Sequence, residues 1–205
     1  MYVIGITGGS GTGKTILLHV LEKKGVLALD CDKVYHELLI VNDMMRREID
    51  DCFPGVLVNG LIDRKKLGKI VFSDKQALQK LSGVTHKYIL DNVKKRLAEW
   101  KEQGGKVAAM DAVALFESGA NEMCDITVGV ISPYDSRILR IMERDSIARS
   151  KAAKRINAQK PDSFYAENCD VILENSYYTT EAFENACNAW FKKLSKKQKF
   201  DVKNK

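Results

Sequence analysis

Short apolar runs alternate with longer stretches of helical spacing along this chain, and the alternation predicts a sheet covered by helices. Five runs are short and apolar, as is typical of buried strands. They are Tyr2–Thr7, Val26–Leu29, Lys106–Met110, Ile126–Ile131 and Val171–Leu173. Because predicted helices lie between these strands, we expect a parallel sheet with helices on both faces.

Two sequences predict where helices begin. Ser132-Pro133-Tyr134-Asp135 has the pattern of a capping box with Pro at the first helical position, so a helix should begin directly after the fourth strand. Ser73-Asp74-Lys75-Gln76 is a second box of this kind. The final helix should begin at about Thr180, because apolar residues recur at helical spacing from Phe183 to Leu194 and predict packing against the core.

An unusually long interval, residues 33–105, separates the second strand from the third. A crossover between parallel strands needs only about a dozen residues. The interval reads as wholly helical, with a turn near Pro54-Gly55 and Asn59-Gly60. We therefore expect a helical, substrate-binding insert, and a core made of residues 1–32, 106–135 and 165–195.

The net charge of +6 is confined to the C-terminal end. Residues 192–205 contain seven lysines and one aspartate, whereas the rest of the chain is neutral, with 26 basic and 26 acidic residues. A neutral main body argues against a nucleic-acid partner, and we expect a solvated, frayed tail. No apolar stretch approaches the length of a membrane span, and Met1 leads directly into the first strand. We therefore expect no signal peptide, no membrane partner and a cytoplasmic location.

The most informative segment is Gly8–Thr15, which fits the phosphate-loop pattern G-x-x-x-x-G-K-[ST] without a mismatch. A predicted strand precedes it and a predicted helix follows it. The glycines let the backbone curl around an anion, and the helix N-terminus adds partial positive charge. Lys14 would reach the β- and γ-phosphates, and the Thr15 hydroxyl would hold Mg²⁺. The segment predicts a nucleoside triphosphate site.

A phosphate loop alone does not distinguish GTPases, motors, transporter subunits and small kinases. The chain has neither the D-x-x-G nor the N-K-x-D motif of GTPases, and its 205 residues are few for a multi-domain ATPase. The sequence therefore favours a small-molecule kinase. Such an enzyme needs an orienting carboxylate and cations around the transferred phosphoryl group.

Candidate carboxylates follow two of the predicted strands. Asp30 and Asp32 follow the second strand, and Asp111 follows the third. Ligands of open parallel sheets bind beyond the carboxyl ends of the strands, so Asp32 is a candidate acceptor for the proton of an attacking hydroxyl. Alternatively, Asp30 or Asp32 caps the helix that begins near Lys33. Asp111 is a candidate for a magnesium contact through water, or a turn cap.

Candidate cations lie on the helix predicted after Ser132. Arg137, Arg140 and Arg144 share this helix, and the last two are four residues apart and so lie on one face. The basic segment continues to Gln159. Together they favour a lid, residues 136–164, that closes over the triphosphate. The alternative is a solvated, charged helix face.

Seven segments, in the same order along the chain, resemble those of the dephospho-coenzyme A kinase family. They are Ile6–Thr15, Asp30–Asp32, Ile62–Phe72, Leu115–Gly119, Arg140–Asp145, Arg155–Gln159 and Asp170–Asn175. The phosphate loop is shared by many kinases. The Asp-x-Asp pair, the Asp-Arg-x-x-Leu-Gly-x-x-Val-Phe block and the late Arg-Ile-x-x-Gln are more specific, and the resemblance covers nearly the whole chain.

The resemblance implies phosphorylation of the ribose 3′-hydroxyl of dephospho-coenzyme A by ATP, with Mg²⁺, as the last step of coenzyme A synthesis. It also implies a three-layer α/β phosphate-loop NTPase fold with a five-stranded parallel sheet, a helical acceptor-binding insert and a helical lid in one kinase domain. By the same resemblance, Asp32 is the catalytic base, Lys14 the γ-phosphate clamp, and Arg140 and Arg144 the lid cations.

The implied contacts extend over further residues. For the nucleotide they are Gly9, Ser10, Gly11, Thr12, Gly13, Lys14, Thr15 and Arg144. For the acceptor they are Thr7, Gly8, Asp32, His86 and Leu115. The metal would bind Thr15, with Asp111 acting through water.

Three positions depart from the family pattern. His86-Lys87 stands where the family usually has His-Pro, Val113-Ala114-Leu115 where it has Pro-Leu-Leu, and Cys169-Asp170 where it has Ala-Asp. The first two concern the acceptor side. The alternative enzyme is a nucleoside or nucleoside-monophosphate kinase, and a different class is a nucleotide-dependent protein whose basic tail contacts RNA. We expect a monomer or a weak homo-oligomer.

Overall fold

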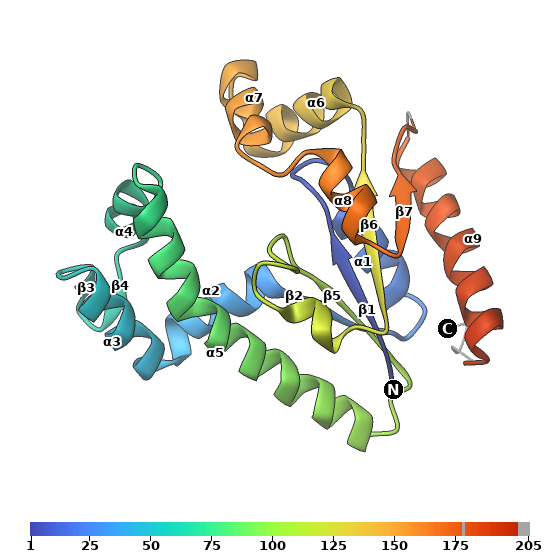
Figure 1. Cartoon of the computed structure of the whole chain (residues 1–205), viewed down its shortest axis with the longest axis horizontal. Helices are drawn as coiled ribbons and strands as arrows, with labels where there is room; N and C mark the ends of the chain where they lie inside the picture. Colours follow the sequence, from blue (N-terminus) through green and yellow to red (C-terminus); the bar gives the residue numbers. More distant parts are fainter. Residues whose placement is uncertain (178, 201–205) are drawn as a thin grey trace. The chain divides into compact units, whose positions relative to one another are not determined.

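The structure is a computed structural model that describes residues 1–177 and 179–200. The chain forms two compact units, Met1–Leu29 with Trp100–Lys205, and Asp30–Glu99 (Figure 1). Most elements belong to the first unit. They are β1 (Tyr2–Thr7), α1 (Lys14–Glu22), β2 (Leu27–Asp30), β5 (Val107–Asp111), the 3₁₀ helix η1 (Ala120–Met123), β6 (Ile126–Ile131), α6 (Tyr134–Asp145), α7 (Arg149–Asn157), α8 (Asp162–Asn168), β7 (Val171–Glu174) and α9 (Thr180–Gln198).

Five strands form one sheet in the order β2-β5-β1-β6-β7. Strand β1 runs parallel to β5 and to β6, and β6 runs parallel to β7; Ile4 lies opposite Ala109 on one side and Ile126 on the other. The α/β class and the five-stranded parallel sheet predicted from the sequence are confirmed. The predicted strand bounds agree with the structure to within one residue at each end.

Alternating side chains of the strands separate the two faces of the sheet. Ile4 and Ile6 of β1 and Val128 and Val130 of β6 are buried on one face, in a cluster with apolar side chains of α1 and α9. Because successive strand residues point to opposite faces, Gly5 and Gly129 face the other layer. Helices therefore cover both faces, as the strand–helix alternation predicts.

The second face requires glycine where its covering layer approaches the strands closely. A methyl group at Gly5 would come within 2.6 Å of Cys124 Sγ and 3.1 Å of a methyl carbon of Leu115. A methyl group at Gly129 would come within 3.2 Å of Tyr165 Cβ on α8. The segment after β5 and helix α8 thus pack directly on the backbone of β1 and β6.

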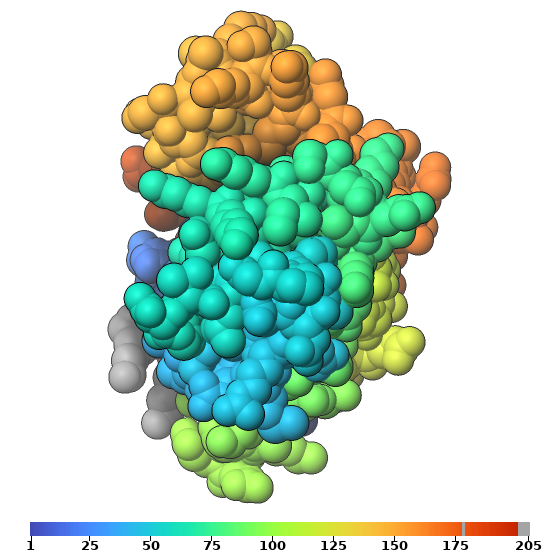
Figure 2. Space-filling model, turned by 90° about the vertical axis from the view of Figure 1, so that its left-hand side faces the viewer, coloured from blue at the N-terminus to red at the C-terminus, as the bar shows by residue number. Residues whose placement is uncertain are grey.

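The second unit has its own apolar core. Its elements are α2 (Cys31–Val41), α3 (Asp43–Cys52), β3 (Leu57–Val58), β4 (Leu61–Ile62), α4 (Arg64–Val71) and α5 (Lys75–Glu102), the last of which continues into the first unit. Val34, Met45, Ile49 and Val56 are almost fully buried in one cluster within it. Figure 2 shows the outer surface of these segments, coloured from blue to green.

The prediction that residues 33–105 are wholly helical is wrong at one place. Strands β3 and β4 pair antiparallel, with Val58 opposite Leu61. Asn59 and Gly60 between them have φ of 50° and 79°, which are the left-handed values that a two-residue hairpin turn requires. The sequence signalled the turn, but the two strands are too short to show an alternating pattern.

Both predicted capping boxes are also wrong, although helices begin where they were expected. The Ser132 hydroxyl donates to the carbonyl oxygen of Asn175 at 2.7 Å, and Pro133 is the cap residue of α6. The Ser73 hydroxyl donates to the carbonyl oxygens of Lys69 and Ile70 at the end of α4. In each case the hydroxyl donates to a backbone carbonyl and does not accept from an N–H group of the following helix.

The lysine-rich end is ordered over much of its length, contrary to the expected frayed tail. Helix α9 continues to Gln198, and the ring of Phe200 lies 5.4 Å from that of Tyr2 and 6.0 Å from that of Phe191. The apolar side of the helix holds it on the core while the lysines remain exposed. Residues 201–205 lie outside the described residues. Within the described part of the chain, no helix is long and apolar enough to cross a bilayer.

Candidate active site

Strand β1 leads into a glycine-rich loop, residues 8–13, from which helix α1 begins. Gly8, Gly11 and Gly13 have φ of 142°, 78° and 109°, and these values are strained for any residue with a side chain. The cap residue of α1 is Gly13, and none of the side chains that the structure describes caps the first turn. The partial positive charge at the start of this helix therefore suits an anion.

The glycine-rich loop packs closely against the end of β6 and against the residue that follows β7. A methyl group at Gly8 would overlap the carbonyl oxygen of Val130 in β6, and one at Gly13 would come within 2.6 Å of Asn175 Nδ2, just after β7. Asn175 is buried and donates to the carbonyl oxygen of Thr12 at 2.9 Å. Residues that are distant in the sequence thus pack against the loop and bind its backbone.

Two residues of the loop motif bind the same carbonyl group. The Thr12 hydroxyl is fully buried and donates to the carbonyl oxygen of Gly9 at 2.9 Å. Lys14 Nζ donates to this oxygen at 3.2 Å. The ammonium group of Lys14 is therefore folded back over the loop, where a bound phosphate would exchange with the carbonyl as its partner.

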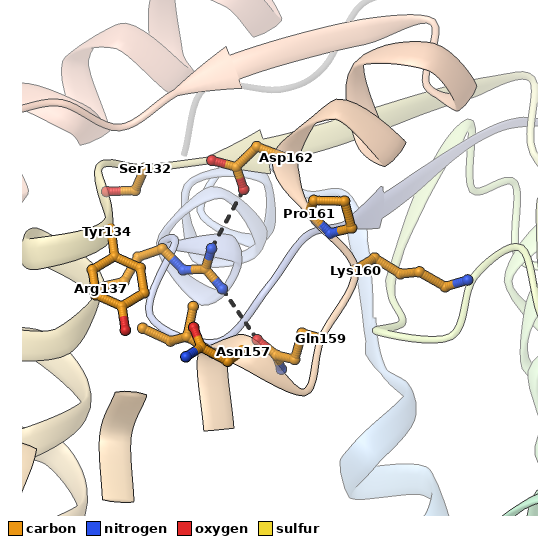
Figure 3. Close-up of a pocket in the computed structure, with 9 residues that line it drawn as sticks. Ser132, Tyr134, Arg137, Asn157, Gln159, Lys160, Pro161 and Asp162 are labelled. Atoms are coloured by element: carbon orange, nitrogen blue, oxygen red, sulfur yellow. Dashed lines mark hydrogen bonds and ion pairs between the residues drawn. The ribbon is translucent and has the colours of Figure 1, made fainter. Parts of the chain in front are cut away.

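Arg137 of α6 and Gln159, just beyond α7, contact the outer side of the loop. Arg137 Nε donates to the Ser10 carbonyl at 3.0 Å and Arg137 Nη2 to Gln159 Oε1 at 3.1 Å. Both residues line a cavity of about 440 Å³ between the start of α6 and the turn from α7 to α8, where Arg137 lies between Gln159 and Asp162 (Figure 3). This cavity places polar groups beside the loop.

Arg140 also reaches the loop. Its Nη1 donates to the carbonyl oxygen of Gly11 at 3.1 Å and to the Ser132 hydroxyl at 2.9 Å. Burial lowers the pKa of Arg140 from its ordinary value, but a guanidinium remains charged at neutral pH. Arg140, the lid cation that the resemblance also implies is catalytic, therefore lies against the phosphate loop.

Arg144, which shares a helix face with Arg140 in the sequence prediction, has a different partner. Its Nε and Nη2 donate to the two carboxylate oxygens of Asp145 at 2.8 and 3.0 Å, and Arg155 also binds this carboxylate. The hydrogen bond from Arg144, and then that from Arg155, lower the pKa of Asp145 to about 2. This pair uses Nε and Nη2 of Arg144, whereas Nη1 takes no part in it.

The two aspartates after β2 have different environments. Asp30 is the cap residue of α2, and its carboxylate accepts a hydrogen bond from the backbone N–H of Lys33 at 3.0 Å. Asp32 lies in the first turn of α2, is exposed, and has no hydrogen bond or ion pair with any residue that the structure describes. The capping role falls to Asp30, so Asp32 keeps a carboxylate that is available for chemistry.

The remaining candidates lie at three places. Thr7 ends β1 and is fully buried, and its hydroxyl donates to the Val113 carbonyl at 3.3 Å. Leu115 is fully buried beside Gly5, so it supports the sheet and presents no surface to a ligand. Thr15 is exposed in the first turn of α1, and Asp111 ends β5 opposite Ile6 of β1. Placed within α5 of the second unit, His86 is partly buried.

Lys87, one of the departures from the family pattern, has a local partner. It donates to Glu48 at 2.6 Å, and the Tyr88 hydroxyl donates to the other oxygen of the same carboxylate at 2.8 Å. These two hydrogen bonds lower the pKa of Glu48. The lysine therefore ties α5 to α3 within the second unit.

Sequence reasoning assigned no role to three residues that the structure places on the loop. The sequence prediction groups Arg137 with the other lid cations, and it contains Gln159 and Asn175 only as the last residues of longer segments. Their contacts with the loop span 127, 149 and 163 residues of sequence. The sequence indicates Gln159 and Asn175 only as the last residues of the segments Arg155–Gln159 and Asp170–Asn175, because no local pattern distinguishes these side chains from solvated polar residues.

The chain is similar to known proteins over most of its length. A profile of the family described as dephospho-CoA kinase matches residues 2–181. A protein named dephospho-CoA kinase from Geobacter sulfurreducens is 34% identical over 196 residues, which are 95% of this chain and 100% of that protein. Another protein of that name, from Fusobacterium nucleatum, is 37% identical over 184 residues, which are 89% of this chain and 93% of that protein.

Solved structures agree with these matches. The dephospho-CoA kinase from Campylobacter jejuni superimposes with a TM-score of 0.69 at 25% identity, and the alignment covers 96% of this chain and 98% of that one. The similarity thus extends over both compact units and over the segment between α6 and β7.

Proposed function

This chain belongs to the dephospho-CoA kinase family, and we propose on that premise that it transfers the γ-phosphoryl group of ATP to the ribose 3′-hydroxyl of dephospho-CoA. The observation that carries the proposal is the uncapped, glycine-lined start of α1, with Lys14 and Arg140 bound to carbonyl groups of the same loop. Such a loop suits a polyphosphate, and membership of the family indicates dephospho-CoA as the acceptor.

The residues present fit ATP and Mg²⁺. A side chain at Gly11 or Gly13 would clash with Arg137 or Asn175 and would carry strained backbone angles, so glycine is required for the loop to keep the curled backbone that suits a phosphate group. The Thr15 hydroxyl, exposed in the first turn, would bind Mg²⁺ directly, and Asp111 would bind it through water. Bound there, Mg²⁺ would neutralise charge on the phosphate oxygens.

The cations act mainly through electrostatics. Phosphoryl transfer has a loose transition state with charge spread over the equatorial oxygens, so positioning and charge stabilisation dominate. We assign Lys14 to the β- and γ-phosphates and Arg140 to the transferred group. Arg144 would contact the nucleotide.

Asp32 has the role of orienting the acceptor hydroxyl and receiving its proton. Its carboxylate is not used as a helix cap, because Asp30 takes that role. General base catalysis of this kind contributes about 10²- to 10⁴-fold in rate. We propose that unit Asp30–Glu99 binds the acceptor and that residues 136–164 act as a lid over the nucleotide.

An acceptor panel tests this function. Purified protein with Mg·ATP is given dephospho-CoA, AMP, CMP, UMP or nucleosides, and ADP release is measured. We expect ADP release with dephospho-CoA and a product phosphorylated at the 3′ position, identified by mass spectrometry and ³¹P NMR. Turnover of a nucleoside or nucleoside monophosphate in preference to dephospho-CoA would replace this function with the alternative kinase.

A further inference from the structure

Ser10 is held at all three of its polar atoms by residues far along the chain. Its backbone N–H donates to Gln159 Oε1 at 2.8 Å, and its hydroxyl accepts from Gln159 Nε2 at 2.9 Å. Its carbonyl oxygen accepts from Arg137 Nε at 3.0 Å. The conformation of the loop at Ser10 is therefore set by groups outside the loop.

The guanidinium of Arg137 is enclosed, and each of its nitrogens has a protein partner. The side chain is 5% exposed. Besides Ser10, its Nη2 donates to Gln159 Oε1 at 3.1 Å and its Nη1 to Asp162 at 3.4 Å, as Figure 3 shows. All three guanidinium nitrogens thus have protein partners, and the side chain is far less exposed than that of Arg144, which is 58% exposed.

Gly9 is adapted to this arginine. A methyl group at Gly9 would overlap Arg137 Nη2 and lie 2.9 Å from the central carbon of the guanidinium. Position 9 is a variable position of the phosphate-loop pattern, so the pattern itself does not ask for glycine there. The guanidinium occupies the space that a side chain at position 9 would need, so any residue larger than glycine would have to displace it.

We propose that Arg137 is a positioning residue, which with Gln159 clasps Ser10 and holds the phosphate loop in the shape that binds and orients the triphosphate. The inference rests on the proposed kinase function for its kinetic readout. In this role Arg137 acts through the hydrogen bonds that it donates to the loop, and not through an interaction of its charge with a phosphate. A misplacement of about 1 Å at a reacting group can cost about 10²-fold in rate, so this clasp matters for catalysis without touching the reacting atoms.

Two substitutions separate the effect of the hydrogen bond to Ser10 from the effect of the positive charge of Arg137. In Arg137→Gln, the side-chain nitrogen takes the position of Arg Nε and can still donate to the Ser10 carbonyl, but the charge is lost. In Arg137→Lys, the charge is kept, but a methylene group replaces Nε. We expect kcat within about 10-fold of wild type for Arg137→Gln and about 10²-fold lower for Arg137→Lys. A kcat for Arg137→Lys equal to or above that of Arg137→Gln would overturn the proposal.

Gly9→Ala gives an independent test by a double-mutant cycle. The added methyl group should expel the guanidinium and lower kcat by about 10²-fold in the wild-type background. In the Arg137→Gln background the guanidinium is gone, so the same substitution should lower kcat by less than about 3-fold. An equal loss in both backgrounds would show that Gly9 and Arg137 act separately and would reject the clasp.

A control and a second readout keep the test independent of the acceptor. Lys23→Gln removes an exposed cation at the end of α1 that pairs with Glu184 and lies outside the loop, the lid and the acceptor-binding unit, and it should leave kcat unchanged. Thermal unfolding and calorimetry with ADP are measured for every variant. Gly9→Ala should lower Tm by about 3 °C or more in wild type but not in Arg137→Gln. If dephospho-CoA were not a substrate, the function would fail while this coupling still decided the clasp.

Discussion

Asn175 Nδ2 donates a hydrogen bond of 2.9 Å to the carbonyl oxygen of Thr12, across 163 residues of sequence. The side chain is 1% exposed, and its Oδ1 is buried without a hydrogen-bond partner among the described protein atoms. The carbonyl of Asn175 in turn accepts from Ser132, which also accepts from Arg140. The end of β7 is therefore tied to the back of the phosphate loop and to the start of α6.

Replacing Asn175 should loosen the loop in a graded way. Asn175→Ala removes the bond to Thr12 and should lower the free energy of unfolding by about 1–3 kcal/mol. Asn175→Asp places a buried carboxylate against that carbonyl and should cost more, about 3 kcal/mol or above. Chemical denaturation measures both values. Asn188→Ala, which loses a bond within α9 only, is the matched control, and equal costs at positions 175 and 188 would contradict the role given to Asn175.

Asp32→Asn should separate catalysis from nucleotide binding. Because the amide cannot accept the proton of the acceptor, kcat should fall by about 10²- to 10⁴-fold while the Kd for ATP stays the same. Steady-state kinetics and calorimetry give the two quantities. The neighbouring Asp30→Asn keeps a capping oxygen for Lys33 and should retain kcat within about 10-fold. Near-normal turnover by Asp32→Asn would remove Asp32 from the mechanism.

Lys14→Ala should harm the transition state more than acceptor binding. The ammonium group donates a hydrogen bond to the carbonyl oxygen of Gly9, and it can exchange this partner for the phosphates. Losing it should lower kcat by about 10²- to 10³-fold, whereas KM for the acceptor should change little. Initial rates with varied acceptor at saturating ATP measure both. An unchanged kcat would refute the role of Lys14.

Arg140 and Arg144 should differ in their effects on turnover. Arg140 contacts Gly11 and Ser132, whereas Arg144 is 58% exposed and bound to Asp145. We expect Arg140→Ala to lower kcat by about 10²- to 10³-fold, and Arg144→Ala to act mainly on KM for ATP. Kinetics of both variants decide this, and the opposite ranking would show that the lid exchanges these arginines when it closes.

Asp145 should make stability depend on pH in the acid range. Its pKa in the folded protein is about 2, below the ordinary value of 3.8, because Arg144 and Arg155 bind the carboxylate. A lowered pKa stabilises the fold above the unfolded-state pKa, and this stabilisation is lost as the pH falls through the folded-state value. Wild type should exceed Asp145→Asn in stability by a constant amount above about pH 5, and the difference should shrink toward pH 2. Denaturation curves measured at several pH values would show no such change if the ion pairs contribute nothing.

Much of the first unit follows from local sequence. The run Tyr2–Thr7, the glycines of the loop and the helix after Lys14 are each specified by near neighbours, because strand burial, left-handed backbone angles and helix spacing are short-range properties. The same reasoning predicted β6 to the residue and began α9 at the observed position. The phosphate loop was therefore recognisable from sequence, and so was the type of ligand it suits.

The roles of individual polar side chains depended on tertiary structure. Local pattern made Ser132 a helix cap, but the fold brings it to Asn175 and Arg140 instead. Arg140 and Arg144 are four residues apart on one helix, yet Arg144 binds the adjacent carboxylate of Asp145 whereas Arg140 binds the phosphate loop. Hydrogen bonds such as those of Arg137 and Gln159 to Ser10 join segments more than a hundred residues apart. Their partners are decided only when parallel strands bring the ends of β1, β6 and β7 to one edge of the sheet, because no short-range pattern encodes which distant group will be there.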